Sequence, residues 1–423
     1  MADLQEKDIV TCFLRNRGAV LLLRRSDRVG SYQGKWGAVS GHVEGTPEET
    51  ALREIAEETG LAKAVRLAHQ GEPFIVDDEA LGTRWIVHPF LFECAHRDLR
   101  LDWEATEAAW VPPPAILRRD TVPHLWTSYA GVAPTLESIQ ADRVSGSATL
   151  SYRALEVLRD RAGQMVHQKE GAETDWATLA ILAQRLLDAR PSMASLRNRI
   201  NRVMHACRDE PLAEAIEREA QAGIERAIAA DERAAQRAAG YVAGRRVFTL
   251  SRSGTVLDAL RQADPPPTMI VIAASRPGGE GAAVADELAR EGRSVMLAPD
   301  AAIPQVFERE LVDVALVGAD TVLPSGSVVN KVGTYLAALV AKSCSIPFYV
   351  AAASDKVSTT NEPHLEDGTP DDLYAGPAPV EVFCPLFEVT PAKLLSGVIT
   401  EDGLLAAVEM QDLAFELKAL ERW

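Results

Sequence analysis

The chain has 423 residues, 47% of them hydrophobic and 25% charged, which is typical of a soluble globular protein of two or three domains. Its net charge is −17, so its surface does not favour nucleic acid or anionic membranes as direct partners. The five cysteines include no CxxC pair, and no apolar run of about 18 residues occurs. We therefore expect a cytoplasmic protein without a disulfide framework or a membrane span.

The N-terminal part of the chain begins with strands. Residues 8–25 form two apolar runs, which predict a pair of strands. A polar loop and a further strand then lead to residues 41–61, GHVEGTPEETALREIAEETGL. Thr46 is a suitable N-cap, Pro47 suits the first helical position, and Gly60 stops the pattern. These signals predict a short helix that follows a tight loop.

Three glutamates of this predicted helix carry its chemistry. Glu54, Glu57 and Glu58 stand at i, i+3 and i+4, so their carboxylates share one helix face. Like charges crowded in this way repel each other unless a cation lies among them. Carboxylate oxygens suit Mg²⁺ or Mn²⁺, bound together with a substrate phosphate. Arg53 stands beside the three and is placed to orient a carboxylate. The alternative is a solvated acidic helix face, because such runs are common on protein surfaces.

The same stretch resembles the Nudix box. The helical half of that box reads Arg-Glu, apolar, any, Glu-Glu, any, Gly, apolar, and residues 53–61 match it at every position. The resemblance implies an α/β/α sandwich and metal-dependent hydrolysis of a nucleoside diphosphate linked to another group. It also implies that Glu54, Glu57 and Glu58 are metal ligands, and that Gly41 is the loop glycine whose backbone approaches the metal.

The first half of the box departs from the family pattern. The loop before the helix is shorter than in the family, so the position of the family's loop glutamate falls on Gly45. Glu44 is a candidate substitute for that ligand, and the alternative is that the ligand is missing. This departure bears on the efficiency of catalysis more than on the fold.

A second acidic segment follows a strand predicted at residues 84–94. It covers residues 102–117, DWEATEAAWVPPPAIL, and resembles a segment that lies near the metal in Nudix proteins. The resemblance makes Glu104 and Glu107 candidates for an additional ligand or the general base. The alternative is a surface loop with two solvated glutamates.

The remaining two-thirds of the chain changes character twice. Residues 121–143 contain proline, glycine and aromatic residues without a clear period, which predicts a linker. Residues 146–243 repeat apolar side chains at helical spacing. After Gly244, short apolar strands alternate with helices, which predicts a parallel, doubly wound sheet. The expected division is a Nudix domain at 1–135, the helical part of a second domain at 136–243, and the Rossmann-like part of that domain at 244–423.

Five polar residues stand at or near the ends of these predicted strands. Ligands of doubly wound sheets bind beyond the carboxyl ends of the strands. Ser251, Arg276, Asp320, Asn330 and Lys331 fall there and offer a hydroxyl, two cations, a carboxylate and an amide. Such a set suits a sugar phosphate or a nucleotide. The alternative is that these residues are caps and turns that stabilise the fold.

The segments SRPGGEG, VGADTVLPSGSVVNKVGT and PFYVAAASDK occur in this order in the C-terminal region. They resemble the translation initiation factor 2B α/β/δ-subunit family, and the resemblance covers roughly residues 140–423. That family also includes methylthioribose-1-phosphate isomerase and ribose-1,5-bisphosphate isomerase. The resemblance implies a helical part followed by a Rossmann-like part, and a homodimer or higher oligomer.

The isomerases of that family use a Cys thiol and an Asp as acid/base pair, and an Asn-Lys pair holds the substrate. Asp320, Asn330 and Lys331 match their counterparts, but Ser251 stands at the Cys position. A serine hydroxyl is a poor acid or base, because its pKa lies far above that of a thiol. Residues 145–147, Ser-Gly-Ser, also replace the isomerases' Arg-Gly-Ala. These differences argue against isomerase activity and leave ligand binding.

We therefore interpret the chain as a Nudix pyrophosphohydrolase that depends on Mg²⁺ or Mn²⁺ and is joined to a sugar-phosphate-binding, nucleotide-binding or regulatory domain. Its expected substrate is a small molecule linked to a nucleoside diphosphate. One alternative is a non-catalytic protein of translation initiation that contacts initiation factor 2. A second alternative is a sugar-phosphate isomerase of the ribose-1,5-bisphosphate type.

Overall fold

The computed structural model describes residues 4–142, 145–169, 172–376 and 378–423. Residue 143, the last of the predicted linker, lies outside these ranges. Within them, no helix is both long and apolar enough to cross a membrane. The chain divides into two compact units: unit 1 holds residues 1–135, 156–179 and 210–224, and unit 2 holds residues 136–155, 180–209 and 225–423.

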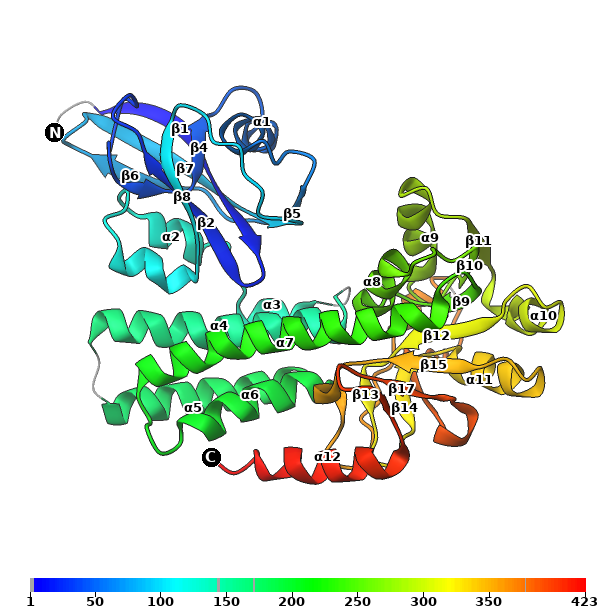
Figure 1. The fold of residues 1–423 in the computed structure, drawn as a ribbon. Coiled ribbons are helices and arrows are strands. Elements are labelled where there is room, and N and C mark those ends of the chain that lie inside the picture. Colours follow the sequence, from blue (N-terminus) through cyan, green and yellow to red (C-terminus); the bar gives the residue numbers. More distant parts are fainter. Residues whose placement is uncertain (1–3, 143–144, 170–171, 377) are drawn as a thin grey trace. The chain divides into compact units, whose positions relative to one another are not determined.

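Unit 1 is built on an eight-stranded sheet (Figure 1). Its two longest strands, β1 (Gln5–Asn16) and β7 (Thr83–Cys94), pair in parallel. Each other strand pairs antiparallel with its neighbour. These are β2 (Ala19–Arg25), β3 (Trp36–Gly37), β4 (Val39–His42), β5 (Val65–Gln70), β6 (Phe74–Asp78) and β8 (Ala105–Val111). The strands predicted within residues 8–25 and 84–94 are confirmed.

The alternation of side chains along the strands gives this sheet two apolar faces. On one face, Val10 of β1 packs in a cluster with Ile55 of α1 (Pro47–Thr59). On the other face, Phe13 of β1 packs in a cluster with residues of α2 (Leu125–Ala130). A helix on each face of the sheet produces the predicted α/β/α sandwich (Figure 1).

Helix α1 begins and ends where the sequence predicts. The Thr46 hydroxyl accepts the Glu49 N–H and the Glu49 carboxylate accepts the Thr46 N–H, which forms a capping box. Pro47 occupies the first turn, and Gly60 ends the helix with a φ of 73°. Both ends are therefore closed by local interactions, and the glutamates between them are held on a regular helix.

The region predicted as a linker contains short helices. α2 is followed by α3 (Leu136–Ala141), and each has only six residues. A 3₁₀ helix, η1 (Pro113–Arg118), lies just before them. Leu125 and Ile139 are buried, so this part of the predicted linker packs into the fold. Six residues make fewer than two helical turns, which is too short for an apolar period to be visible in the sequence.

The predicted helical region forms four long helices. They are α4 (Ser147–Gln168), α5 (Ala172–Ala189), α6 (Ala194–Cys207) and α7 (Ala213–Val242). Helix α7 continues through Gly240 to Val242. Gly240 does not adopt the positive φ that would end the helix.

Helix α4 contributes residues to both compact units, since the division falls at Glu156. Within unit 1, Glu156 forms a buried ion pair with Arg15 of β1 at 2.8 Å. Arg159 donates to the carbonyl oxygen of Gly18 at 2.6 Å, and its side chain is fully buried. The second half of α4 is therefore part of the packed interior of unit 1.

Unit 2 contains a seven-stranded sheet in the order β11-β10-β9-β12-β15-β17-β18. All neighbouring pairs are parallel except β17 with β18. The strand order reverses between β9 and β12, which confirms the predicted doubly wound arrangement. The strands are β9 (Arg246–Leu250), β10 (Met269–Ala273), β11 (Val295–Ala298), β12 (Val314–Gly318), β15 (Phe348–Ala351), β17 (Gly397–Ile399) and β18 (Leu404–Leu405).

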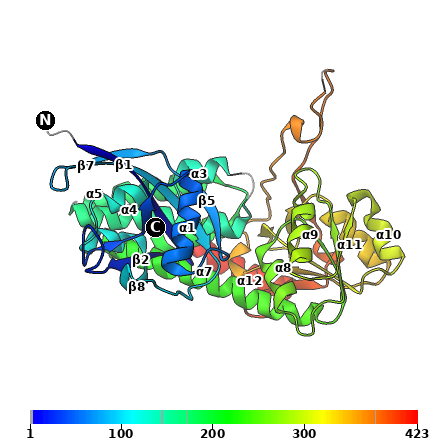
Figure 2. The same ribbon diagram turned by 90° about the horizontal axis from the view of Figure 1, so that it is seen from above.

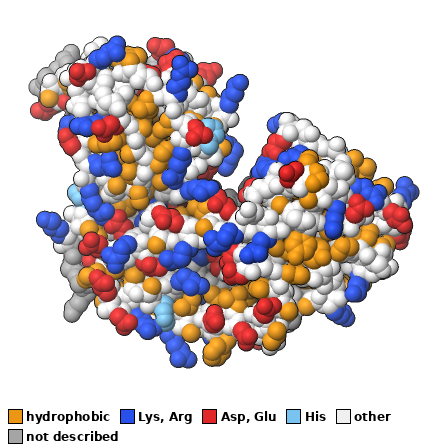
Figure 3. Space-filling view, in the orientation of Figure 1, with side chains coloured by type: hydrophobic (Ala, Val, Ile, Leu, Met, Phe, Trp, Pro, Cys, Tyr) orange, Lys and Arg blue, Asp and Glu red, His pale blue; other side chains and the backbone are white. Residues whose placement is uncertain are grey.

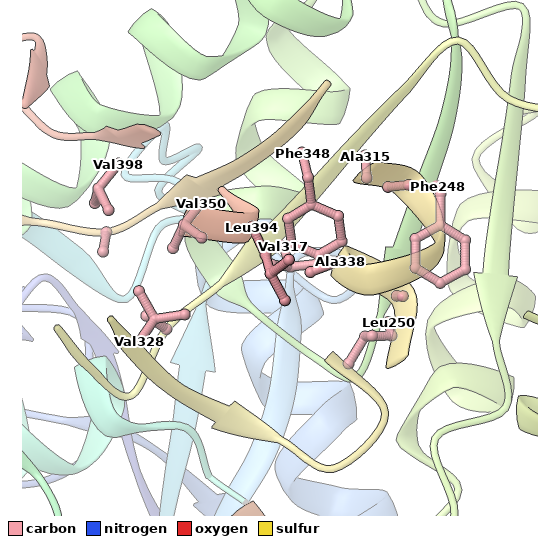
Figure 4. Packing of buried hydrophobic residues seen from close by; sticks show 14 of the residues in the cluster. Phe248, Leu250, Ala315, Val317, Val328, Ala338, Phe348, Val350, Leu394 and Val398 are labelled. Atoms are coloured by element: carbon pink, nitrogen blue, oxygen red, sulfur yellow. The ribbon is translucent and has the colours of Figure 1, made fainter. Parts of the chain in front are cut away.

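Helices cover both faces of this sheet. On one face, Val317 and Phe348 pack with Ala338 of α11 (Figure 4), in a cluster that also includes residues of α10 and α12. On the other face, Val247 and Leu316 pack with residues of α8, α9 and the end of α7. The helices are α8 (Gly254–Gln262), α9 (Glu280–Arg290), α10 (Ile303–Glu308), α11 (Thr334–Ser343) and α12 (Ala407–Ala419).

A small antiparallel sheet completes unit 2 and carries two of the predicted ligand-binding residues. It consists of β13 (Thr321–Val322), β14 (Val328–Lys331) and β16 (Phe387–Thr390). Short 3₁₀ turns are η2 (Asp300–Ala302), η3 (Ser354–Lys356), η4 (Pro370–Asp372) and η5 (Ala392–Leu394). The chain between η3 and β16 extends away from the sheets (Figure 2). The last two residues of β14 are Asn330 and Lys331.

Candidate functional site

Unit 1 contains a cavity of about 600 Å³. Small-molecule sites commonly have volumes of about 300–1,000 Å³. Its floor is made of side chains on one face of four neighbouring strands: Ile9 and Thr11 of β1, Ser40 and His42 of β4, Val76 of β6, and Trp85 and Val87 of β7. Helix α1 and the residues before β8 form an acidic end. This cavity unites the Nudix-like motif with segments far from it in sequence.

A glycine allows α1 to approach β4 closely. A Cβ atom at Gly41 would lie 2.2 Å from the carboxyl carbon of Glu54, far inside van der Waals contact. Both residues line the cavity, and the Glu54 side chain is 15% exposed. A side chain at position 41 would therefore displace the Glu54 carboxylate.

Arg53 joins the short loop to the helix. Its guanidinium lies 2.6 Å from Glu44 Oε2 and 2.9 Å from Glu54 Oε1. The Glu44 N–H also donates to Thr50 Oγ1 at 3.0 Å, and the Thr50 hydroxyl donates back to the Glu44 carbonyl at 2.9 Å. The shortened loop is thus closed onto α1, and it presents Glu44, the candidate substitute ligand, to the cavity.

Glu58 differs from its two neighbours on the helix. Its carboxylate accepts the Ser40 N–H at 2.9 Å, the residue is buried, and it does not line the cavity. Burial raises the pKa of Glu58 to about 8, and the charges of Glu104 and Glu54 add to the rise while the Ser40 N–H opposes it. Glu57, by contrast, is exposed and lines the cavity.

Glu104 belongs to the same acidic group. It lines the cavity, and its pKa is raised first by burial and then by the charge of Asp102, with smaller contributions from Glu54 and Glu57. Arg25, which also lines the cavity, opposes this rise. A bound cation would stabilise the charged form of a carboxylate whose pKa is raised in this way.

The carboxylates at the acidic end suit a hard divalent cation, although they do not converge on one point. No three His, Cys, Asp or Glu side chains converge into a ready-made metal site in the part of the chain that the structure describes. Glu54, Glu57 and Glu104 nevertheless line one end of the cavity and offer only carboxylate oxygens. Oxygen-only ligands are those that Mg²⁺ and Mn²⁺ prefer.

Glu107 lies apart from this group. It is exposed on β8, pairs with Arg24 at 3.2 Å, and does not line the cavity. The structure therefore brings Glu104 to the acidic end and leaves Glu107 outside it.

The other half of the cavity is aromatic and apolar. The rings of Trp85 and His42 have centroids 5.8 Å apart and planes inclined by 31°. The Tyr32 hydroxyl donates to Asp78, and burial together with this bond raises the pKa of Tyr32 to about 12. The Trp85 side chain opposes this rise in the pKa of Tyr32.

In unit 2, Ser251 and Arg276 follow the adjacent strands β9 and β10. The Ser251 N–H donates to Ser275 Oγ at 2.7 Å. The Asp300 carboxylate accepts the N–H groups of Ser275 and Arg276 at 2.8 and 2.9 Å. Ser251 and Ser275 both adopt positive φ, a conformation that side chains rarely take and that is common at functional sites. The two predicted positions thus belong to one turn region.

Asp320 lies at the end of β12, on the other side of the point where the strand order reverses. Loss of solvent raises the pKa of Asp320, while the charge of Lys356 and a hydrogen bond from Ser147 oppose the rise. The charge of Lys331 also lowers this pKa, so the predicted acid and the predicted cation lie within electrostatic reach of each other. Lys356 itself donates to the carbonyl oxygen of Ala319 at 2.8 Å.

The neighbouring pair Asn330 and Lys331 is also engaged. Lys331 is buried, and its ammonium group lies 3.0 Å from Glu280 Oε1. The Asn330 amide donates to the Thr334 hydroxyl at 3.0 Å. Ser251, Arg276 and Asp320 therefore follow strands of the parallel sheet, as predicted. Asn330 and Lys331 instead lie in β14 of the small antiparallel sheet, and their contacts also serve the fold.

Comparison with known proteins accounts for both halves of the chain. Residues 6–131 match the NUDIX domain, and residues 143–407 match the initiation factor 2 subunit family. The second match covers more than half of the chain. The protein belongs to the initiation factor 2 subunit family.

Relatives of this initiation factor 2 family protein include isomerases. A methylthioribose-1-phosphate isomerase of Thermosynechococcus vestitus is 38% identical over 147 residues, which is 32% of this chain and 41% of the isomerase. The match therefore spans less than half of that isomerase. A ribose 1,5-bisphosphate isomerase of Archaeoglobus fulgidus is 31% identical over 293 residues, 65% of this chain and 89% of that protein. The C-terminal part is thus isomerase-like in sequence.

A solved structure extends the comparison to the fold. The solved structure of translation initiation factor eIF-2B from Pyrococcus horikoshii OT3 has 28% sequence identity to this chain. The match has a TM-score of 0.57 and covers 64% of this chain and 94% of that chain. The Rossmann-like fold of the C-terminal part is therefore shared with a structure named for translation initiation.

Several residues at the two candidate sites of this initiation factor 2 family protein could not be identified from its sequence. Asp102 stood in the acidic segment but was not singled out beside Glu104. Arg25 and Trp85 stood on predicted strands whose inward face was unknown. Lys356 was part of a quoted segment, PFYVAAASDK, without an assigned role. The available signal was the strand alternation around Trp85, which shows that residues 85 and 87 share a face but not which face is hollow.

Proposed function

We propose that the NUDIX domain is a hydrolase that cleaves a nucleoside diphosphate derivative with Mg²⁺ or Mn²⁺. The observation that carries this proposal is one cavity with a carboxylate-lined end and an aromatic, apolar end. A cation bound at the carboxylates would neutralise phosphate oxygens and lower the pKa of a bound water molecule. The apolar end is of a kind that binds the organic part of a ligand.

Each residue of the acidic end has a distinct role in this proposal. Glu54 and Glu57 are the direct ligands, because they line the cavity, and Arg53 orients Glu54. Glu58 would reach a cation only by releasing the Ser40 N–H, and its pKa of about 8 keeps its carboxyl mostly protonated at neutral pH. Glu104 is the candidate general base. Its pKa is raised toward neutral pH, and a general base works best when its pKa lies near the pH of the reaction.

Arg25 supplies the positive charge that a diphosphate requires. Its guanidinium is half-buried in the cavity and donates to the Ser31 carbonyl at 3.0 Å. A guanidinium has five N–H donors in a planar arrangement, so most of them stay available for phosphate oxygens. Arg25 is therefore proposed to hold and orient the diphosphate.

A pair of glutamate variants tests the proposal. Wild type, Glu57→Gln and Glu107→Gln are incubated with Mg²⁺ or Mn²⁺ and a panel of nucleoside triphosphates, nucleotide sugars, dinucleotides and ADP-ribose, and products are separated by chromatography. Both glutamates are exposed, but only Glu57 lines the cavity. We expect Glu57→Gln to lose at least about 100-fold in kcat and Glu107→Gln to keep wild-type turnover. Wild-type protein that converts no member of the panel would overturn the proposal.

We further propose that the C-terminal domain binds a sugar phosphate or a nucleotide at the strand ends. In its support, Lys331 is buried and lies within electrostatic reach of Asp320, beside the reversal of strand order. Isothermal titration with ribose 1,5-bisphosphate and with AMP would compare Lys331→Met with Lys342→Met, an exposed lysine of α11. We expect at least about tenfold weaker binding in Lys331→Met only. Equal affinities for both variants would contradict the site.

Isomerase activity is the second candidate for this domain, because its relatives are named as sugar-phosphate isomerases. Asp320, whose pKa is raised, provides one half of an acid/base pair. Ser251 stands where the resemblance expects a thiol. Conversion of ribose 1,5-bisphosphate followed by NMR, in wild type and in Ser251→Cys, decides this point. Absence of product with both proteins would remove the isomerase hypothesis.

The C-terminal domain also has a surface suited to a protein partner. Tyr335, Leu336 and Leu339 of α11 are exposed, and Figure 3 shows hydrophobic side chains gathered over the region of α10 and α11. Contiguous apolar surface of this kind commonly marks an interface. We propose self-association through this face, with initiation factor 2 as an alternative partner suggested by the similarity to eIF-2B. Light scattering of Leu336→Glu, and co-purification with initiation factor 2, would distinguish the two.

A further inference from the structure

The aromatic end of the cavity has an arrangement that the proposed hydrolysis does not use. Trp85 of β7 and His42 of β4 both line the cavity, with ring centroids 5.8 Å apart and planes inclined by 31°. Val76 stands opposite Trp85 in the register of β6 with β7, and also lines the cavity. Lys7 Nζ lies 5.9 Å from the Trp85 ring, but Lys7 does not line the cavity.

This part of the cavity offers a flat, apolar surface. Ile9, Val76 and Val87 line the cavity together with the two rings, and Trp85 is only half-buried. The indole nitrogen is buried and has no hydrogen-bond partner in the part of the chain that the structure describes. Half-exposed aromatic rings in a cavity bind flat π systems such as nucleobases by stacking.

The strand order sets the distance between this surface and the acidic end. β4 carries Gly41 against Glu54, β1 pairs with β4, and β7 pairs with β1. Neighbouring strands lie about 4.8 Å apart, so β7 is about 10 Å from β4. Gly41 is level with Val10 and His88, and Trp85 lies three residues before His88, about 10 Å along the strand, so the separation is about 14 Å. An extended nucleoside diphosphate spans a separation of this order. A diphosphate held at Glu54 would therefore place its base over β7.

The size of the surface distinguishes one class of base. An indole with an imidazole beside it, tilted by 31°, presents more ring area than a single six-membered base covers, and a two-ring purine matches it better. We propose that Trp85, with His42 beside it, is the stacking platform for a purine base, and that the substrate is a purine nucleoside diphosphate derivative. The substrate assignment rests on the proposed hydrolysis, whereas the binding of the base does not.

Equilibrium binding tests the platform without requiring turnover. Isothermal titration would measure the affinities of ADP and CDP, each with Mg²⁺, for four proteins. These are wild type, Trp85→Ala, Trp85→Phe and Trp110→Phe. Trp110 lies on β8 outside the cavity and serves as the matched control. We expect Trp85→Ala to weaken ADP binding by about 5- to 150-fold, with a smaller effect on CDP. Trp85→Phe should retain most of the affinity, and Trp110→Phe all of it.

A spectroscopic measurement covers the case in which Trp85→Ala does not fold. Stacking of a base quenches indole fluorescence, so ADP should quench wild type more than Trp85→Phe. Equal quenching of the two proteins, equal ADP affinity in Trp85→Ala and wild type, tighter binding of CDP, or no binding of ADP would each overturn the platform. The hydrolysis assay is independent of these results. If ADP binds through Trp85 and no substrate is cleaved, the proposed hydrolase fails and the platform stands.

Discussion

Replacing Gly41 by Ala should change the geometry of the acidic site strongly and the stability of the fold only slightly. The added Cβ would lie 2.2 Å from both Cδ and Oε1 of Glu54 and 2.6 Å from its Cγ. Ordinary contact is about 3.5 Å, so the carboxylate must retreat by about 1 Å or more. Because only side-chain atoms obstruct the new methyl group, we expect a loss of about 1 kcal/mol in the free energy of unfolding. A displacement of about 1 Å in a catalytic group costs about 100-fold in rate.

The assay for Gly41→Ala combines three measurements. Urea unfolding gives the stability, electron paramagnetic resonance of free Mn²⁺ gives the affinity of the acidic site, and product chromatography gives kcat. Gly240→Ala is the control, because a Cβ at Gly240 meets no atom within 4 Å. It should gain about 1 kcal/mol of stability through helix propensity and leave Mn²⁺ affinity unchanged. A Gly41→Ala protein that binds Mn²⁺ and turns over substrate as well as wild type would refute the argument from close approach.

Three further substitutions test the interior. Glu156→Gln removes one of two carboxylates bound to buried Arg15, and should lower the free energy of unfolding by about 3 kcal/mol; an unchanged urea midpoint would contradict this. Gly281→Ala should also cost about 3 kcal/mol, because its Cβ would lie 1.9 Å from the backbone oxygen of Ala273, which cannot rotate away; an unchanged melting temperature would argue against it. The pKa of Asp320 is raised in the folded state, so ionisation of this carboxyl destabilises the fold as pH rises. Asp320→Asn should therefore have a larger free energy of unfolding than wild type near pH 8. This difference between the two proteins should vanish by about pH 4, where the carboxyl is largely protonated in the unfolded chain as well. A gain in unfolding free energy that does not depend on pH would show that Asp320 is not the cause.

The features that could be predicted from the sequence are those that depend on neighbouring residues. The bounds of α1 follow from Thr46, Pro47 and Gly60, which cap and stop the helix through contacts within a few residues. The doubly wound sheet follows from short apolar strands alternating with helices, because right-handed crossovers leave few other arrangements. In both cases the determining interactions are local, or the topology is restricted by general rules.

The features that could not be predicted depend on distant pairings. β1 and β7 are far apart in the sequence but pair directly, in parallel, in the sheet. This pairing places Trp85 on the same cavity floor as Ile9. Glu107 lies outside the cavity because β8 pairs with β2 in a register that sets Glu107 opposite Arg24. Glu280 was quoted within SRPGGEG, but its pairing with Lys331 depends on how two loops meet. No local pattern encodes these contacts.

The continuity of α4 has a consequence for how this gene could have evolved. The two family matches meet between residues 131 and 143, yet unit 1 also takes residues 156–179 and 210–224 from the C-terminal match. A recombination event at the sequence boundary would deliver Arg15 without Glu156. The sequence match at residues 6–131 is therefore smaller than the structural unit, because it lacks one of the two carboxylates that hold Arg15.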